Sequence, residues 1–377
     1  MSKRAANMGS IRKRPDGRWE GRYTASDGKQ HSVYGKTQAA CASALRAAQN
    51  DVDNGHWLQP SQMTVKEWFE IFLRDYQAHT TQRTRHVYGQ IARLHIVPVI
   101  GDVKVSRLTP MHVRRVVNAM VEKGLSPNYI HHAHGVLSVA MNAAVESGLV
   151  KQNPAENIKT PPRNTPKFNI VDRDLLPQFI EAASHNPNGN ILIFAILTGL
   201  RAGELRGLKW SAIDFDKSSM DVCRQLQTHI HAAFTPPKYN SSRVVELTSQ
   251  SVALLKKQRK DLAALRLAAG DRWESNEIVD DLVFRSATGH FIAESVLHKA
   301  AREVGAEIGI PELHPHDLRH SYAVAAIRSG VDIKTVQHNL GHKSAAMTLD
   351  VYAAYTADAG KAGAKMLSAY WGDVFDN

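Results

Sequence analysis

Residues 314–322, His-Pro-His-Asp-Leu-Arg-His-Ser-Tyr, are the stretch that does most to decide the fold. They predict the start of a helix that runs to about Arg328 and ends at Gly330. His316 and Arg319 are three residues apart, so they share one face at the N-terminal end of this helix. Because helix N-termini attract anions, this face is suited to a phosphate.

The sequence after this helix predicts two more helical segments. A short helix follows Asp332 and ends at Leu340-Gly341-His342, and another begins near Ser344 and carries Tyr352 and Tyr355. Three neighbouring segments would therefore present arginine, histidine and tyrosine from their ends. Such an arrangement builds a pocket from rigid parts.

A second candidate anion site lies upstream. The apolar run Ile191–Leu197 predicts a buried helix that ends in Thr-Gly-Leu-Arg-Ala-Gly-Glu-Leu, residues 198–205. Its glycines permit a sharp turn into the next helix. Arg201 can reach an anion at that helix start, although it can also simply pair with Glu204.

A polar loop at residues 236–242 leads into an alternating strand at residues 243–247. This pattern predicts half of a hairpin with Lys238 near its tip. On the loop alone, the more common explanation is that Lys238 is a solvent-facing lysine.

The first 60 residues predict a small separate domain. Asp16-Gly17 and Asp27-Gly28 separate short segments of β character, which predicts a three-stranded sheet followed by a helix from Thr37 to about Asn54. In the middle strand, aromatic residues alternate with mostly basic ones, so one face should be basic and exposed to solvent. The candidate DNA contacts on this domain are Arg12, Arg14, Arg18 and Arg22.

Residues 61–160 predict a helical domain of about a hundred residues. Its helices should begin at Thr64, Thr81, Thr109 and Ser126, and Arg83 and Arg85 are further candidates for DNA contact. The proline-rich segment 153–166 predicts a linker, and residues 168–377 form the last domain.

Composition and charge indicate an intracellular protein with a polyanionic partner. Residues 1–60 hold ten basic and five acidic side chains, residues 61–160 hold twelve and seven, and residues 161–377 hold 25 and 24. The basic excess lies in the first 160 residues, as expected for nucleic-acid binding, although a solvated basic surface would look the same. Two cysteines, no leader segment and no long apolar run favour a cytoplasmic protein without membrane association.

Three phrases, TGLRAGEL, HPHDLRHSYA and LGHKSAAMTLDVY, occur in this order over about 160 residues and resemble the motifs of the tyrosine recombinase or phage integrase family. The resemblance implies a mixed, mainly α fold with a small N-terminal three-stranded sheet, a helical core-binding domain and an α-rich catalytic domain. It implies that Arg201 and Arg319 clamp the phosphate, Glu204 steadies Arg201 and Lys238 is a general acid. His316, His342 and Tyr352 match the two histidine positions and the nucleophile, with Tyr355 in reserve.

The implied reaction is cleavage and rejoining of DNA through a 3′-phosphotyrosine, without metal, ATP or another cofactor. The histidines at 131, 132 and 134, and those at 314, 316 and 320, lack the spacing of a hydrolytic metal site, so no metal ligands are predicted. The implied partners are double-stranded DNA with core and arm attachment sites and a homotetramer on that DNA. An excisionase and a host DNA-bending protein are further candidate partners.

The N-terminal domain favours an integrase of a phage or integrative element. A chromosome-dimer or plasmid resolvase of the same family is the alternative within the class. A metal-dependent nuclease and an inactive DNA-binding regulator are the alternatives outside it; the first should lose activity in EDTA.

Overall fold

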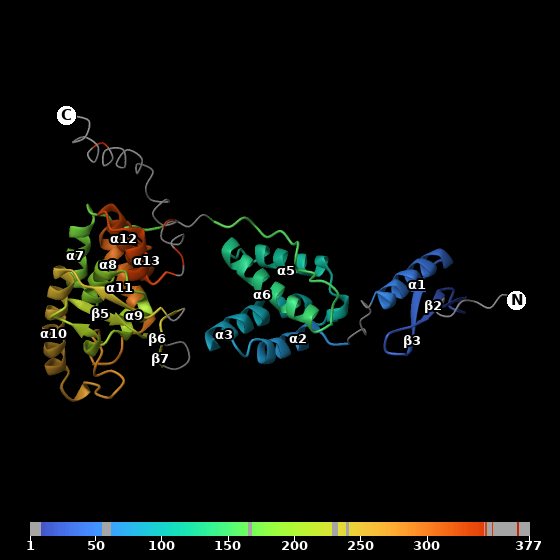
Figure 1. The fold of residues 1–377 in the computed structure, drawn as a ribbon, viewed down its shortest axis with the longest axis horizontal. Helices are drawn as coiled ribbons and strands as arrows, with labels where there is room; N and C mark the ends of the chain where they lie inside the picture. The colour runs from blue at the N-terminus through green and yellow to red at the C-terminus, as the bar shows by residue number, and fades with distance from the viewer. Residues whose placement is uncertain are drawn as a thin grey trace. The chain divides into compact units, whose positions relative to one another are not determined.

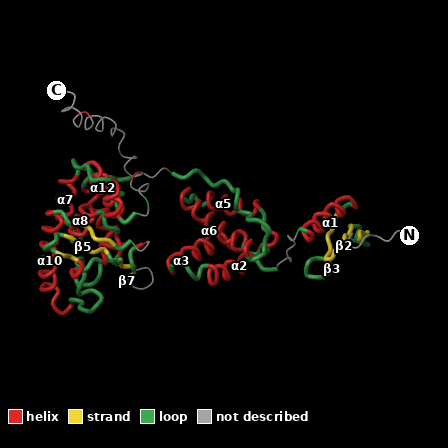
Figure 2. Tube along the Cα trace, in the orientation of Figure 1, coloured by secondary structure: helices red, strands yellow, loops and turns green. Residues whose placement is uncertain are grey.

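The computed structural model describes residues 9–54, 62–164, 168–227, 233–238 and 241–342, with residues 344, 349 and 368 besides. The chain divides into two compact units, Met1–Thr165 and Pro166–Asn377. Both are coloured along the chain in Figure 1, and Figure 2 separates the helices from the strands. The fold is mainly helical with small antiparallel sheets, which confirms the predicted fold class.

The N-terminal module is the predicted sheet and helix. Its strands are β1 (Ser10–Lys13), β2 (Trp19–Thr24) and β3 (Gln30–Gly35), which are antiparallel in that order. Helix α1 (Gln38–Asp53) is capped by Thr37, whose side chain accepts a hydrogen bond from the N–H of Ala40. Helix α1 packs against β2 at Gly21, where a Cβ would lie 3.2 Å from Cys41 Sγ.

The opposite face of this sheet carries the predicted basic side chains, and Arg12 and Arg18 are exposed there. Glu20 is buried there at 3 % exposure, because Arg12 Nε donates to it at 2.6 Å and Arg22 Nε lies 3.4 Å away. These contacts hold the pKa of Glu20 down to about 2, with the hydrogen bond from Arg12 as the largest cause. The face therefore carries an ion-pair network in which two arginines share one carboxylate, so it keeps a positive charge.

The helical part of the first unit has its core between α2 and α6. Trp68 is buried there, and its indole N–H donates to the carbonyl of Ala140 at 2.9 Å. Its elements are α2 (Val65–Ile71), a π-helical turn (Phe72–Tyr76), α3 (Gln82–Ile91), a second π-helical turn (Ala92–Ile96), α4 (Val97–Ile100), a 3-10 turn (Val105–Arg107), α5 (Pro110–Glu122) and α6 (Pro127–Glu146).

Two boundaries in this part differ from the prediction. The helix expected to end near Leu94 continues to Ile100, because a new α-helical segment follows the second π-helical turn. Pro98 is tolerated in the first turn of that segment, where a backbone N–H is not needed. Burial of Ile96 and Ile100 stabilises the continuation. The predicted linker starts as packed structure: the Asn153 amide donates to the Ser138 carbonyl, and Ile158 is buried.

The second unit is built around helix α8 (Gly189–Thr198). Its apolar residues are almost all buried, and α7 (Leu176–His185), α10 (Ser249–Ala269) and α12 (Pro315–Arg328) pack around it (Figure 1). The other elements are α9 (Ala202–Gly207), a 3-10 turn (Trp210–Ala212), β4 (Ile213–Asp214), β5 (Ser219–Val222), β6 (Gln225–Gln227), β7 (Ala233–Thr235), β8 (Arg243–Glu246), a second 3-10 turn (Gly270–Arg272), α11 (Glu294–Glu307) and α13 (Ile333–Leu340).

The strand expected after Lys238 is present as β8, but its partner differs from the hairpin that the sequence predicted. Strand β8 pairs antiparallel with β5, in a sheet of order β4-β5-β8, while β6 pairs with β7. Lys238 therefore lies in the connection between β7 and β8. Among the helices that the structure describes, none is long and apolar enough to cross a membrane.

Candidate active site

The turn between α8 and α9 places Arg201 at a helix start. Gly199 ends α8 in the left-handed region, with φ at +66°, where a side chain is strained. Space is restricted as well, because a Cβ on Gly199 would lie 2.5 Å from Cδ1 of Tyr322. Glycine is therefore required at this position, and Arg201 follows two residues later as the N-cap of α9.

The guanidinium groups of Arg201 and Arg319 meet at the C-terminal end of α13. Arg319 is 2 % exposed; it donates to the carbonyl of Gly199 at 2.8 Å and to that of Leu340 at 2.6 Å. Arg201 donates to the carbonyl of Gly341 at 2.7 Å. The two arginines predicted as a clamp are 118 positions apart in sequence, yet they bind adjacent carbonyls.

Arg319 also has a donor without a partner. Its Nε–H is buried and makes no hydrogen bond within the described part of the chain. A buried donor left unsatisfied costs about 1–3 kcal/mol, so an anion that accepts from it would be stabilised. Desolvation and the charge of Arg201 lower the pKa of Arg319, but a guanidinium remains charged at neutral pH.

Glu204 is a buried carboxylate shared by two arginines. It accepts from the Arg201 backbone N–H at 2.9 Å and from its guanidinium at 2.9 Å, so the predicted pairing is present. Arg243, a residue that the sequence reasoning missed, donates to both oxygens of Glu204, at 3.1 and 2.9 Å. Despite desolvation, which acts to raise it, the Arg243 and Arg201 contacts lower the pKa of Glu204 and keep it ionised.

Three histidines at the site are neutral at pH 7. Although His316 is partly exposed to solvent, desolvation and the charge of Arg319 lower its pKa to about 4. Desolvation likewise lowers the pKa of His342 and of His320 to about 3. His316 and His320 stack edge to face, with ring centroids 4.4 Å apart. A neutral imidazole can accept a proton, which is what a general base requires.

Lys238 lies near this cluster of arginines and histidines. The exposed Lys238 is close enough to His316 for its charge to contribute to the lowered pKa. Tyr352 and Tyr355 lie outside the described residues. The structure thus brings together Arg201, Glu204, His316, Arg319, His342 and Lys238, all of them drawn from the predicted set.

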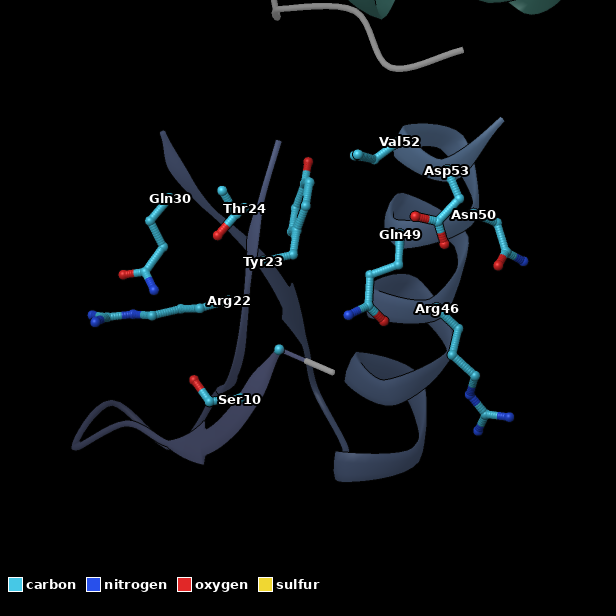
Figure 3. A pocket seen from close by; sticks show the side chains of 11 residues that line it. Ser10, Arg22, Tyr23, Thr24, Gln30, Arg46, Gln49, Asn50, Val52 and Asp53 are labelled. Atoms are coloured by element: carbon cyan, nitrogen blue, oxygen red, sulfur yellow. The ribbon is translucent and has the colours of Figure 1, made fainter. Parts of the chain in front are cut away.

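The other predicted DNA contacts lie on the first unit. Arg14 and Arg18 flank the exposed ring of Tyr34, at 5.6 and 5.7 Å from its centroid. Arg22 lines a pocket of about 410 Å³ between the sheet and α1, together with Gln30, and Figure 3 shows both side chains beside the strands. The Arg12 side chain pairs with Glu20. On α3, Arg83 is exposed and Arg85 is half-buried.

The residue types at the site suit one chemistry. Within the described ranges, no group of three or more His, Cys, Asp and Glu side chains is arranged to hold a metal ion. After Glu204 is balanced by Arg243, the charges of Arg201 and Arg319 are left to attract an anion. Forked guanidinium donors match the oxygens of a phosphate and stabilise the charge that grows on them during phosphoryl transfer.

A mainly helical unit that gathers arginine, histidine and lysine side chains in this way is suited to an enzyme that binds a phosphate and transfers it. Residues 170–358 match the phage integrase family, and residues 64–121 match the N-terminal SAM-like domain of phage integrases. The first match spans half of the chain, so this protein belongs to the phage integrase family. It is a site-specific recombinase that cleaves and rejoins DNA, as the predicted function stated.

Relatives from several bacteria and phages support the assignment over most of the chain. A XerC-like tyrosine recombinase from Caldanaerobacter subterraneus is 28 % identical over 85 % of this chain and 86 % of its own. The integrase of Mycobacterium phage D29 is 26 % identical over 93 % of both chains.

Solved structures share the fold. The Tn1549 transposon integrase superposes with a TM-score of 0.70 at 18 % identity, covering 81 % of this chain and 99 % of that one. The lambda integrase has a TM-score of 0.56 at 16 % identity, covering 93 % of this chain and 96 % of that one.

Proposed function

We propose that this integrase cuts one DNA strand at a time with Tyr352 as the nucleophile, and that Arg201 and Arg319 clamp the scissile phosphate. The single observation that carries the proposal is the buried Nε–H of Arg319, which has no partner among the described residues and lies next to a second guanidinium. A phosphate oxygen would satisfy this donor. The negative charge that develops on phosphorus would then face two fixed cations.

The remaining residues account for the proton transfers. The phenol of Tyr352 attacks phosphorus, and neutral His316 takes its proton. The bond from phosphorus to the 5′ oxygen breaks, and Lys238 donates a proton to that leaving oxygen. His342 supplies a further donor to the phosphate, and Glu204 fixes the direction of Arg201. The phosphotyrosine retains the bond energy for attack by another 5′ hydroxyl, so the cycle needs neither ATP nor a metal.

The experiment is a covalent trapping assay. A duplex copied from a junction of the mobile element, nicked close to the cleavage position, loses a short fragment after cleavage and leaves the protein attached. The adduct should form in EDTA, and Tyr352→Phe should abolish it, whereas Tyr355→Phe, the matched control, should keep it. An adduct formed by Tyr352→Phe would show that the nucleophile is another residue, and loss of the wild-type adduct in EDTA would favour a metal-dependent nuclease.

The partners of the enzyme follow from the same proposal. Residues 168–377 are the catalytic domain, residues 61–160 hold the core site with Arg83 and Arg85, and residues 1–60 hold an arm site through Arg12, Arg14, Arg18 and Arg22. Support comes from the lambda integrase, which was solved bound to a core site and as a tetramer on a Holliday junction, and from the Tn1549 integrase in complex with DNA. We propose the same homotetramer here, acting on the DNA of a phage or integrative element in the bacterial cytoplasm. An excisionase and a host DNA-bending protein complete the proposed set of partners.

A further inference from the structure

Arg243 is a buried charged side chain that supports the site. It lies on β8, and its side chain is 2 % exposed. Its guanidinium binds Glu204 with two parallel hydrogen bonds, donates to the carbonyl of Asn339 at 2.7 Å and donates to that of Ser241 at 3.3 Å. Arg243 therefore connects the strand after Lys238 to both α9 and α13.

The charge of Arg243 decides how much positive charge the phosphate encounters. Glu204 orients Arg201, but a carboxylate that paired with Arg201 alone would cancel its charge. Arg243 supplies the second cation, so Glu204 can hold Arg201 in place while a net positive charge remains. Carbonyl groups hold the arginines without cancelling any formal charge.

Besides Glu204, Arg243 also holds the C-terminal end of α13. Three consecutive carbonyls, those of Asn339, Leu340 and Gly341, accept hydrogen bonds from Arg243, Arg319 and Arg201 respectively. Gly341 lies directly against the guanidinium of Arg243, since a Cβ there would be 2.9 Å from it. His342 is the next residue after Gly341, so the position of its ring depends on the contacts of Arg243 with the end of α13.

We infer that Arg243 is a positioning residue for DNA cleavage: it balances Glu204 so that Arg201 keeps its charge for the scissile phosphate, and it anchors the end of α13 that presents His342. The inference rests on the proposed function of Arg201. It assigns Arg243 no contact with DNA, so its effect should appear in the rate of cleavage at saturating DNA and not in DNA affinity.

The test uses single-turnover cleavage of the nicked duplex by the full chain. Arg243→Gln should lower the rate constant roughly 100-fold, because Arg201 then pairs with an unbalanced carboxylate. Adding Glu204→Gln removes that carboxylate charge, so the double variant should cleave faster than Arg243→Gln. A purely structural role predicts the reverse, since the second substitution removes another partner from the same network. The rate constant, rather than the amplitude, is compared, because it is independent of the folded fraction.

Arg285→Gln is the matched control. Arg285 is also buried in this unit, and it donates to the carbonyls of Gly289 and Glu274 and pairs with Asp280 away from the site. Its replacement should lower the melting temperature and leave the rate constant near that of the wild type. If Arg243→Gln does not fold, Arg243→Lys replaces it; lysine keeps the charge, so Glu204→Gln should then give no recovery.

The outcomes distinguish a failure of the proposed function from a failure of the role inferred for Arg243. A wild-type enzyme that forms no adduct would overturn the proposed function and this inference with it. If the wild-type enzyme cleaves but the double variant is no faster than Arg243→Gln, the inference alone is overturned. The same holds if Glu204→Gln restores cleavage to the Arg243→Lys variant.

Discussion

Replacing Gly199 with alanine should damage both the stability and the active site. The left-handed φ of +66° costs an L-residue about 1–2 kcal/mol. The added Cβ would lie 2.5 Å from Tyr322 and 2.7 Å from Leu340, an overpacking that typically costs about 1–3 kcal/mol. We therefore expect the free energy of unfolding to fall by about 2–5 kcal/mol. Because the Gly199 carbonyl holds Arg319, cleavage should slow as well.

Gly330→Ala is the matched control. Gly330 lies in the same unit with φ at +83°, and a Cβ there would have no atom within 4 Å. The free energy of unfolding of Gly330→Ala should therefore fall only by the backbone contribution, about 1–2 kcal/mol. This variant should cleave DNA at the wild-type rate. Urea unfolding of the full chain gives the stabilities, and hydrogen exchange of the α8 amides assigns the transition to the second unit. Equal stabilities and equal cleavage rates for the two variants would refute the steric argument.

Three further results are expected. In the folded chain the pKa of His316 is lowered to about 4 and those of His320 and His342 to about 3. Below pH 6.5 the unfolded chain therefore binds more protons than the folded chain. The free energy of unfolding should therefore fall as the pH drops from 6.5 to 4.5, and a flat urea midpoint over that window would contradict the assignment. Deleting residues 1–60 should spare cleavage of core DNA and weaken binding to arm DNA in a gel-shift assay; undiminished arm binding would remove that domain's proposed role. Core-DNA affinity should fall steeply with salt, with a slope of log K on log salt of about −0.9 per phosphate contact, and a slope near zero would discount the basic excess of residues 1–160.

The elements that the sequence predicted well are those set by neighbouring residues. Thr37, Thr64 and Ser126 each cap the helix that was expected to start there, because a cap needs only the side chain and the next turn of backbone. The buried helix α8 was recognisable from an apolar run. The two Asp-Gly turns fixed the N-terminal sheet in the same way.

The elements that escaped prediction depend on partners far away in the chain. Strand β8 pairs with β5 instead of with its nearer neighbour, and nothing in its own residues distinguishes the two. Arg243 resembles any strand arginine until Glu204, 39 positions earlier, is seen beside it. The packed start of the supposed linker depends likewise on the Asn153 amide reaching α6. The family pattern identified the motif residues of the site, but it did not identify Arg243, which supports several of them.

The site keeps like charges together by using mainly dipoles to hold them. Arg201, Arg243 and Arg319 approach one another around a single carboxylate, which cannot neutralise all three. The carbonyls at the end of α13 accept from one donor of each arginine, and a helix C-terminus carries a partial negative charge that favours cations. Dipoles position a guanidinium without cancelling its charge, so the electrostatic cost of gathering the arginines is met during folding. The field that a phosphate meets is then already in place before DNA arrives, which is what preorganised stabilisation of a transition state requires.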